Sequence, residues 1–408
     1  MSIGRIGVVI FDWYPFEPRS RRLAETAATA GYSVDVVCLR RPEEKAYEVC
    51  NGVRLHRLSV SRHYGGSLPI LVLSWCCFLF LATIKITRLH GKYRYDVVHV
   101  HNIPDFLVFS TLFARLAGAR IILDVQDVTP ELMAVKCKGR LRSILMRLAI
   151  WQERLSTTFA DHVVTVGWPF EELLLQRGVP PEKLTIILNS AYPPFFPAAK
   201  RPLPPTETAV DKTQPFILMY HGTIAERYGL DTAIRAVALA RSTVPNLRLE
   251  IKGVGDSIPQ LKKLVAELDA SEQVAFLQAS LDDIADFISH GDVGIISSRN
   301  DAFMELLLPT KAYEFAWMHR PMIVSDTRAM RSMFRPESVV FCDPSSPECF
   351  ANAIIDLYQH PEKRACMIAH AAEDYEPYRW ESMTVRYKRL LISLSRARVT
   401  EGYQMTLE

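Results

Sequence analysis

The chain of 408 residues lacks the motifs of several common enzyme classes. It has no G-x-G-x-x-G and no G-x-x-x-x-G-K-[ST] motif, which excludes the usual dinucleotide fingerprint and the P-loop. It also has no G-x-S-x-G motif, the nucleophile elbow of α/β-hydrolases. Its eight cysteines form no C-x-x-C pair and no zinc-binding spacing. Free thiols of this kind are typical of a reducing compartment, and the start MSIGRIGVVIFDWY predicts a strand rather than a signal peptide, so we expect a cytoplasmic protein.

Positive and negative charges are unevenly divided along the chain. The net charge of +3 combines +7 for residues 1–195 (24 Lys and Arg, 17 Asp and Glu) with −4 for the remainder (24 and 28). A basic first half indicates an anionic neighbour, such as an acidic membrane or a phosphorylated acceptor, although a merely solvated basic face explains it equally well. No basic stretch carries interleaved aromatic side chains, so we expect no nucleic-acid partner.

The first half alternates between short apolar runs and helical stretches. The runs predicted as strands are 6–11, 34–39, 53–58, 96–101, 120–125, 162–167 and 184–188. Continuous apolar strands that alternate with helices are typical of parallel sheets covered on both faces. Residues 1–195 are therefore predicted to form one Rossmann-like α/β domain, which we expect to bind the acceptor.

The same pattern begins again after a proline-rich segment. YPPFFPAAKRPLPP, residues 192–205, holds six prolines and predicts an extended connector, which we place at 196–215. Further strand-like runs follow at 216–222, 247–253, 274–278, 292–297, 321–326 and 339–343. We predict a second Rossmann-like domain over 216–375 and helices over 376–408 that pack back on the first domain. Because open α/β sheets bind ligands beyond the carboxyl ends of their strands, a cleft facing both sheets is the expected site.

One apolar run is long enough to raise the question of a membrane. LPILVLSWCCFLFLATI, residues 68–84, has 17 residues without charge, near the lower limit for spanning a bilayer. It lies between two strands predicted for one sheet, and a single crossing would separate those strands. We therefore expect a helix that either packs inside the domain or lies on an anionic membrane surface, near Lys85, Arg88, Lys92 and Arg94.

The second domain opens with a strand, a glycine and a helix, an arrangement that suits a phosphate. His221-Gly222-Thr223 directly follows the first strand, and Arg227 lies in the loop before a helix that starts near Leu230. Glycine allows close backbone approach and arginine pairs with phosphate. Strand-end glycines are nevertheless common, and an arginine in such a loop is more often solvated.

The segment LLLPTKAYEFAW, residues 306–317, places two charges in apolar surroundings. Thr310 begins a predicted helix, whose free amides and hydroxyl can face an anion together with Lys311. At about 4 Å, a lysine and a phosphate interact by roughly 4 kcal/mol at an effective dielectric near 20. Glu314 lies one helical turn after Lys311, where it would accept hydrogen bonds from the hydroxyl groups of a nucleotide ribose. The alternative is a surface ion pair between Lys311 and Glu314.

These pieces together resemble the family-4 retaining glycosyltransferases of the GT-B architecture, in particular bacterial enzymes that build cell-surface polysaccharides. The matching stretches keep their order over most of the chain: PFEPRSRRLAETAATAGYSVDVVCLRRP, YDVVHVHNIPDFLVF, ILDVQDVTPEL, FADHVVTVGWPFEELLLQRGVPPEKLTIILNS, YHGTIAERYGLDTAIRAV and LPTKAYEFAWMHRPMIVSD. The resemblance implies that Arg227 and Lys311 bind the donor diphosphate and that Glu314 holds the ribose. It also implies that strand-end residues of the first domain face the acceptor and the transferred sugar, namely His101, Asn102, Gln126, Asp127 and Glu131.

The second domain departs from the family pattern at two positions. Many relatives carry two acidic residues with seven residues between them, and the first position here is Leu306. Glu305 or Asp301 is expected to take that role by adjustment of the loop. His319 stands where glycine is usual.

The first domain departs at two further positions. Pro18-Arg19-Ser20 replaces a frequent Gly-Gly pair, and Arg19 is expected to reach the donor phosphates. Gln126 stands where a histidine that helps to place the reacting sugar is common. Glutamine can hydrogen-bond there but cannot carry a proton.

Metal and cofactor chemistry is not expected. The chain has no Asp-x-Asp motif, the metal–diphosphate site of the other large glycosyltransferase class. His99-x-His101 has metal-ligand residue types but no evident third ligand in the sequence.

The sequence thus predicts a metal-independent hexosyltransferase-like enzyme with Gln126, Asp127, Arg227 and Lys311 as catalytic residues. It would move a sugar from a nucleotide-diphosphate sugar to the hydroxyl of an acceptor, with retention of configuration. The acceptor is expected to be a lipid-linked saccharide at the inner face of the cell membrane. Two alternatives stay open: an inactive transferase-like assembly subunit, indicated by Gln126 and Leu306, and a sugar-nucleotide epimerase of the same architecture.

Overall fold

A computed structural model describes residues 3–61, 68–136, 142–202, 214–278 and 283–395. The chain divides into two compact units: Met1–Leu188 with Glu381–Glu408, and Asn189–Trp380. The first boundary lies at Leu188 rather than Phe195, so the start of the proline-rich segment belongs to the second unit. Residues 203–213 of the predicted connector lie outside the described residues. The last helix, from Glu381 on, belongs to the first unit, whereas residues 376–380 belong to the second.

The first unit is built on an eight-stranded sheet of order β3-β4-β2-β1-β5-β6-β7-β8. The strands are β1 (Arg5–Val9), β2 (Ser33–Leu39), β3 (Tyr47–Cys50), β4 (Val53–Leu58), β5 (Val97–His101), β6 (Arg120–Val125), β7 (His162–Thr165) and β8 (Leu184–Ile186). All neighbours pair in parallel except β3, which is antiparallel to β4 at one edge. The sequence did not predict β3, because its side chains are mostly exposed and form no apolar run.

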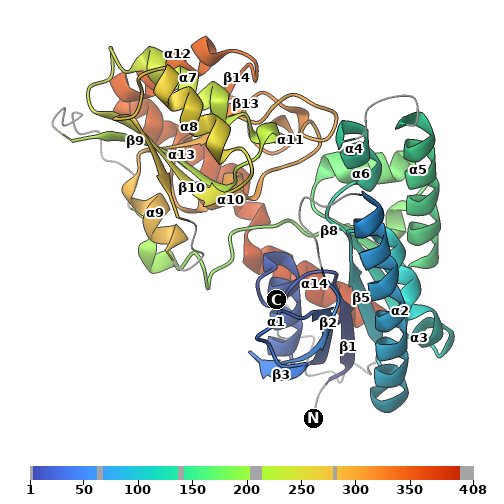
Figure 1. The fold of residues 1–408 in the computed structure, drawn as a ribbon. Helices are drawn as coiled ribbons and strands as arrows, with labels where there is room; N and C mark the ends of the chain where they lie inside the picture. The colour runs from blue at the N-terminus through green and yellow to red at the C-terminus, as the bar shows by residue number, and fades with distance from the viewer. Residues whose placement is uncertain (1–2, 62–67, 137–141, 203–213, 279–282, 396–408) are drawn as a thin grey trace. The chain divides into compact units, whose positions relative to one another are not determined.

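Helices cover this sheet in the first unit (Figure 1). They are α1 (Pro18–Thr29), α2 (Leu68–Tyr93), η1 (Asp105–Thr111), α3 (Leu112–Leu116), α4 (Thr129–Lys136), α5 (Arg142–Phe159), α6 (Trp168–Gln176), η2 (Pro181–Lys183) and α14 (Trp380–Leu394). The start of α1 is capped by the Glu17 carboxylate, which accepts hydrogen bonds from the backbone amides of Arg19 and Ser20. This cap places Arg19 in the first turn of α1, the helix that follows β1 along the chain.

The second unit is built on a six-stranded parallel sheet of order β11-β10-β9-β12-β13-β14. The strands are β9 (Phe216–Thr223), β10 (Leu247–Val254), β11 (Val274–Leu277), β12 (Val293–Ile296), β13 (Met322–Ser325) and β14 (Val340–Cys342). The helices are η3 (Ala198–Lys200), η4 (Glu226–Tyr228), α7 (Leu230–Ala240), α8 (Ile258–Glu267), α9 (Ile284–His290), α10 (Thr310–Trp317), α11 (Arg328–Arg331), α12 (Pro347–Gln359), α13 (Pro361–Tyr375) and η5 (Glu376–Tyr378).

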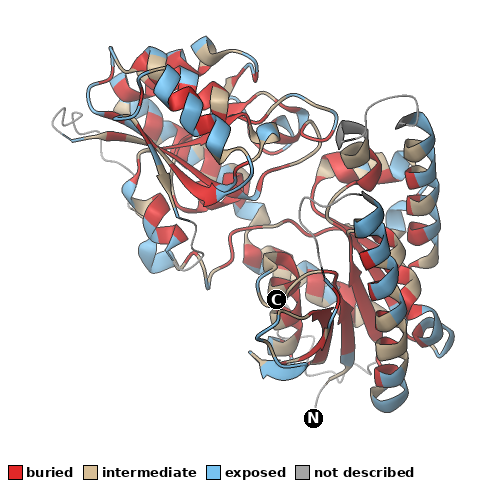
Figure 2. Cartoon of the chain, viewed as in Figure 1, coloured by how far each residue is buried: buried red, intermediate tan, exposed pale blue. Residues whose placement is uncertain are grey.

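The apolar runs of the sequence become the two sheet cores. Figure 2 shows buried strands at the centre of each unit and exposed outer helix faces. In the second unit α7 presents Ala233, Ile234 and Val237 to the sheet, and all three are fully buried. Burying one large aliphatic side chain contributes about 1.5–3 kcal/mol, so these repeated contacts stabilise the unit.

The long apolar run forms most of α2. Strands β4 and β5, which precede and follow this helix, lie in the same sheet, so a single crossing of a membrane is excluded. Phe78, Ala82 and Ile86 are fully buried at every fourth position and form the face that packs on the unit. Within the described residues, α2 is the one helix whose length and apolar composition would suffice to cross a bilayer.

Candidate functional site

The predicted donor residues of the second unit come together where β9 and β12 end. These strands are neighbours in the sheet, so the loops that follow them meet. Arg299 donates its backbone amide to the carbonyl of Arg227 at 2.9 Å, and Ser297 Oγ donates to the carbonyl of Tyr228 at 3.2 Å. Gly229 has a φ of 58°, and a Cβ there would lie 2.0 Å from the Ser297 carbonyl oxygen. Only glycine allows this close approach.

Lys311 lies in the first turn of α10 and is only 6% exposed. Its ammonium nitrogen lies 4.6 Å from the ring centroid of Tyr220 and 4.7 Å from that of Tyr228. Its stem passes beside Gly222, where a Cβ would lie 3.7 Å from Lys311 Cε. Lys311 forms no ion pair with any described residue. A buried ammonium without an anionic partner is unfavourable unless a ligand supplies the negative charge.

Burial has a direct effect on the charge of Lys311. It lowers the pKa of the ammonium to about 8, although the nearby carboxylate of Glu314 opposes this shift. Glu314 is 7% exposed, and its Oε2 lies 3.4 Å from His221 Nε2. Burial, helped by the charge of Lys311, lowers the pKa of His221 to about 3, so this imidazole is neutral. The alternative of a surface ion pair between Lys311 and Glu314 is therefore wrong, because both side chains are buried.

The remaining predicted donor residues are chain neighbours of Lys311 or of residues that lie near it: Thr223 follows Gly222, Arg227 precedes Tyr228, and Thr310 precedes Lys311. Thr223 ends β9 and Thr310 begins α10, and both are exposed. No side chain caps the start of α10 after Pro309, so its first amides stay available to an anion. Arg227 is half-buried in η4, with its guanidinium 5.8 Å from the ring centroid of Phe303. The second unit thus gathers a lysine, an arginine, two hydroxyls and free amides.

The two acidic residues expected to substitute at Leu306 are engaged with the backbone. Glu305 Oε2 accepts a hydrogen bond from the Arg328 amide at 2.8 Å, at the start of α11. Asp301 Oδ1 accepts from the amides of Phe303 and Met304 and so holds its own loop. The predicted sugar contact of Glu305 stays a prediction, and in this structure its carboxylate caps a helix.

His319 shows why glycine is usual at its position. Its φ is 51°, in the left-handed region that glycine adopts freely. Its Nδ1 lies 3.1 Å from the carbonyl oxygen of Pro202, and this contact compensates for part of the backbone strain.

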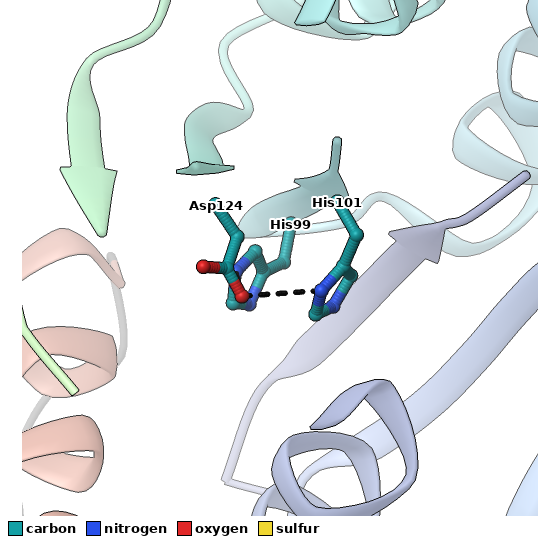
Figure 3. Close-up of side chains that lie close together, drawn as sticks. All are labelled: His99, His101 and Asp124. Carbon is teal, nitrogen blue, oxygen red and sulfur yellow. Dashed lines mark ion pairs between the residues drawn. The ribbon is translucent and has the colours of Figure 1, made fainter. Parts of the chain in front are cut away.

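In the first unit, a buried cluster forms where β5 and β6 end. His101 and Asp124 are partners in the register of these strands, and His101 Nδ1 lies 3.1 Å from Asp124 Oδ2 (Figure 3). The ring of His99 stacks on that of His101 with centroids 4.5 Å apart. Tyr387 of α14 lies with its hydroxyl 3.0 Å from His99 Nδ1. The returning helix therefore closes this cluster.

Arg19 is bonded inside the same cluster. Its Nε and Nη2 donate to the two oxygens of Asp124 at 2.7 and 2.8 Å, and its Nη1 donates to the Ile187 carbonyl at 2.7 Å. Despite burial, the charge of Arg19 and the bonds from His101 and His99 hold the pKa of Asp124 well below its usual range. Arg19, only 3% exposed, thus has a different role from the predicted contact with donor phosphates: it neutralises a buried carboxylate.

The cluster has the residue types of a metal site, because ligand atoms of His99, His101 and Asp124 lie within 4.8 Å of one another. Asp124 is the third candidate ligand that the sequence did not reveal. A dication at this position would lie against the Arg19 guanidinium, which already bonds both Asp124 oxygens. The repulsion between these cations makes a hydrogen-bonded network the better interpretation.

Asn102 holds the loop that carries the predicted catalytic residues of the first unit. Its Oδ1 accepts from the Gln126 amide at 2.8 Å, and its Nδ2 donates to the Asp127 carbonyl and to Asp105 Oδ1, each at 2.7 Å. The side-chain nitrogen of Gln126 lies 3.0 Å from His101 Nδ1. His101, Asn102, Gln126 and Asp127 are therefore brought together, and their contact with the acceptor or transferred sugar stays a prediction.

Glu131 lies apart from that group and is paired within the unit. Arg177 bonds Glu131 and also Glu153, at 2.9 and 3.0 Å for the two Glu153 oxygens. Burial raises the pKa of Glu153 to about 7, although Arg177 opposes this shift. The proposed contact of Glu131 with the acceptor stays a prediction, and this side chain already has a basic partner.

Comparison with known proteins identifies the family. The Glycosyl transferase 4-like domain matches residues 16–190, and the Glycosyl transferases group 1 domain matches residues 205–374. The chain belongs to the family-4 glycosyltransferases of the GT-B fold. The two matched domains correspond to the two α/β units of the structure.

Similar proteins support this assignment over nearly the whole length of the chain. A glycosyltransferase of Methanocaldococcus jannaschii is 24% identical over 374 residues, 88% of this chain and 90% of that protein. The colanic acid biosynthesis glycosyl transferase WcaI of Escherichia coli is 26% identical over 207 residues, 49% of each chain. Sucrose-phosphate synthase from Thermosynechococcus elongatus superposes with a TM-score of 0.76 at 18% identity, covering 96% of this chain and 99% of that chain. HepE of Anabaena, solved with UDP-glucose, superposes with a TM-score of 0.69 at 13% sequence identity, covering 96% of this chain and 100% of that chain.

Sequence reasoning missed several residues of this glycosyltransferase that hold its candidate site. Asp124 lay inside a run predicted as a buried strand, and a carboxylate in such a run was the available signal. Arg177 carried no signal, because its partners Glu131 and Glu153 are distant in sequence.

The lowered pKa of Lys311 predicts a pH dependence of donor binding by this glycosyltransferase. A diphosphate held by Lys311 would require the charged ammonium, so the affinity for a diphosphate should fall as the pH rises through about 8, by about tenfold for each further pH unit. Calorimetric titration with the cognate nucleoside diphosphate from about pH 7 to about pH 9 measures this. In Lys311→Arg the group stays charged, and the affinity should be flat over this range. A flat profile in the unmodified protein would remove Lys311 from the site.

Proposed function

We propose that this glycosyltransferase moves a sugar from a nucleotide-diphosphate sugar to the hydroxyl of a saccharide acceptor, with retention of configuration and without a metal ion. The observation that carries the donor class is Lys311, a buried ammonium that forms no ion pair with any described residue, beside the uncapped start of α10. HepE, with the same fold, was solved with UDP-glucose, which supports a nucleotide sugar.

The reaction breaks the bond between the sugar C1 and the diphosphate oxygen and forms a bond from C1 to the acceptor oxygen. The electron pair goes to the departing diphosphate, where Lys311, Arg227 and the first amides of α10 stabilise the developing negative charge. The acceptor attacks from the face that the diphosphate leaves, and a phosphate oxygen takes its proton. Glu314 accepts hydrogen bonds from the ribose, and Nε2 of the neutral His221 lies 3.4 Å from the carboxylate.

We propose that no metal ion is needed, because Lys311, Arg227 and the start of α10 supply positive charge at the diphosphate. Two basic side chains and a helix start supply the positive potential that a divalent ion supplies in other phosphate sites. In the first unit the positive charge of Arg19, which is bonded to Asp124, disfavours binding of a metal ion at this carboxylate by electrostatic repulsion. Gln126 and Asp127, held by Asn102, are proposed to contact the transferred sugar.

The acceptor is proposed to be a lipid-linked saccharide in surface polysaccharide assembly, used at the cytoplasmic face of the membrane. The name of the relative WcaI, for colanic acid biosynthesis, supports this class of product. The basic first half of the chain supports an anionic membrane or acceptor.

The test is the anomeric configuration of the product. Incubation with the cognate nucleotide sugar and acceptor should give a product with the donor's configuration, observed by the anomeric proton coupling in NMR. Gln126→Ala should lower single-turnover transfer by about 10²-fold, because the amide positions the sugar in the transition state. Glu182→Ala, a change on the exposed surface of the same unit, is the control and should have no effect.

The two alternatives give different results in this assay. An inactive assembly subunit would transfer nothing, whereas transfer that Gln126→Ala abolishes would refute that alternative. An epimerase would convert the donor sugar without any acceptor. Inversion at the anomeric carbon would contradict the retaining mechanism.

A further inference from the structure

Helix α5 is amphipathic, but its apolar stripe lies on the solvent-exposed face rather than on the face that packs against the unit. Its outer face carries an apolar stripe at helical spacing, made of Ile144, Leu148, Trp151 and Leu155, and all four are exposed. Trp151 is 61% exposed. A stripe of this kind usually faces the interior of a unit, so its exposure needs a separate explanation.

The inner face of α5 carries buried polar side chains beside the buried Ala149. Glu153 and Ser156 are buried there, and Thr157 donates to the Glu153 carbonyl at 2.9 Å. The ion pair between Glu153 and Arg177 of the α6 end fixes which face points inward. The pair is buried and short, so turning the helix to bury Trp151 would leave the buried carboxylate of Glu153 unpaired. The apolar stripe is thus held outward by the fold.

Helices α2 and α3 add to the same side of the first unit. Leu73 and Phe80 lie seven residues apart on one face of α2 and are 70% and 65% exposed, and Leu116 of α3 is 76% exposed. Both α2 and α5 pack against η1, and α2 also packs against α3. Figure 1 shows α2 and α5 among the helices of the first unit, and Figure 2 shows exposed residues on both.

We call this surface the docking face and define it by its exposed apolar side chains on the three helices: Ile70, Val72, Leu73, Phe80, Leu112, Phe113, Leu116, Ile144, Leu148, Trp151 and Leu155. The exposed charged side chains on these three helices are all positive. The described basic side chains of these helices are Lys85, Arg88, Lys92, Arg115, Arg147 and Arg154. The only acidic residue on α2, α3 or α5 is Glu153, which is buried.

We infer that the docking face lies on a bilayer that contains anionic phospholipid. Its apolar side chains lie at the boundary between headgroups and acyl chains, and its basic side chains lie at the headgroups. Apolar side chains flanked by lysine and arginine are the pattern of interfacial helices. A second copy is a poorer occupant, because a symmetric contact would bring the same positive charges face to face. The strands on both sides of α2 share one sheet, so the helix lies on the membrane and does not cross it.

This inference deepens the proposed function, since it names three helices rather than one as the membrane contact of an enzyme that uses a lipid-linked acceptor. The test measures binding of the full chain, without donor or acceptor, to vesicles of phosphatidylcholine with and without phosphatidylglycerol. We expect sedimentation with the anionic vesicles that weakens with added salt. The double change Leu148→Glu with Trp151→Glu should weaken partitioning by at least about tenfold, because two large apolar side chains leave the interface. Leu73→Glu with Phe80→Glu should do the same.

The matched control is Leu239→Glu, an equally exposed leucine on α7 of the second unit, which should leave vesicle binding unchanged. Calorimetric binding of the nucleoside diphosphate should be unchanged in all three variants, which separates loss of docking from loss of folding or of the donor site. Vesicle binding that survives both double changes would overturn the inference. So would a concentration-dependent dimer, seen by sedimentation equilibrium, that these changes dissolve, because the occupant would then be a second copy.

Discussion

Replacing Lys311 by methionine is expected to weaken nucleoside diphosphate binding by about 10³-fold, because an ammonium near a phosphate contributes roughly 4 kcal/mol at an effective dielectric near 20. Methionine keeps the apolar stem between Tyr220 and Tyr228 and removes only the charge. The variant should fold at least as stably as the native protein, since burial already disfavours the ammonium and lowers its pKa to about 8.

Titration calorimetry measures the affinity, and thermal unfolding without ligand measures the stability. Lys263→Met is the control, because this lysine of the same unit is 79% exposed and pairs only with Glu267. Glu314→Gln should weaken binding by about 10-fold or more and should remove any preference for a ribonucleotide over its 3′-deoxy analogue. Unchanged affinity in both Lys311→Met and Glu314→Gln would show that the diphosphate binds elsewhere.

The second large effect is expected at Arg19. Arg19→Met leaves the carboxylate of Asp124 fully buried without its guanidinium partner, and breaking a buried pair in this way destabilises a protein by about 3–5 kcal/mol. Urea unfolding measures the loss, and hydrogen exchange of the β5 and β6 amides assigns it to the first unit. Arg21→Met is the control two residues away: its pair with Glu25 lies nearer the surface and contributes about 0.3–0.5 kcal/mol.

The same pair predicts how stability changes with pH. The pKa of Asp124 in the folded state is well below its usual value of 3.8, so its contribution is fully present above that value and is lost as the pH falls through the folded pKa. In Arg19→Met the folded pKa of Asp124 rises, and the protonated carboxyl is less costly to bury. The difference in unfolding free energy between the two proteins should therefore narrow as the pH falls.

A combined change distinguishes an unpaired charge from a packing defect. Arg19→Met with Asp124→Leu removes both members of the pair, and replacing a buried pair by apolar residues is often neutral. The double variant should be more stable than Arg19→Met alone. If it is equally unstable, the role of Arg19 is packing rather than neutralisation of Asp124.

Local patterns in the sequence determined most elements of the two sheets. The run 6–11, for example, is continuous and apolar because its strand is buried on both faces. Lys311 and Glu314 were identifiable for a related reason. Their charges lie within an apolar helix, and burial of such charges is costly unless they have a function.

Tertiary structure alone decided which distant side chains became partners. Arg19 and Asp124 are separated by 105 positions, and Glu153 meets Arg177 on another helix. Ion pairs of this kind leave no periodic signal in the sequence, because each depends on a single long-range contact. The orientation of α5 depends on one of them: its hydrophobic stripe alone predicts a buried face, and the buried Glu153–Arg177 pair holds that face outward.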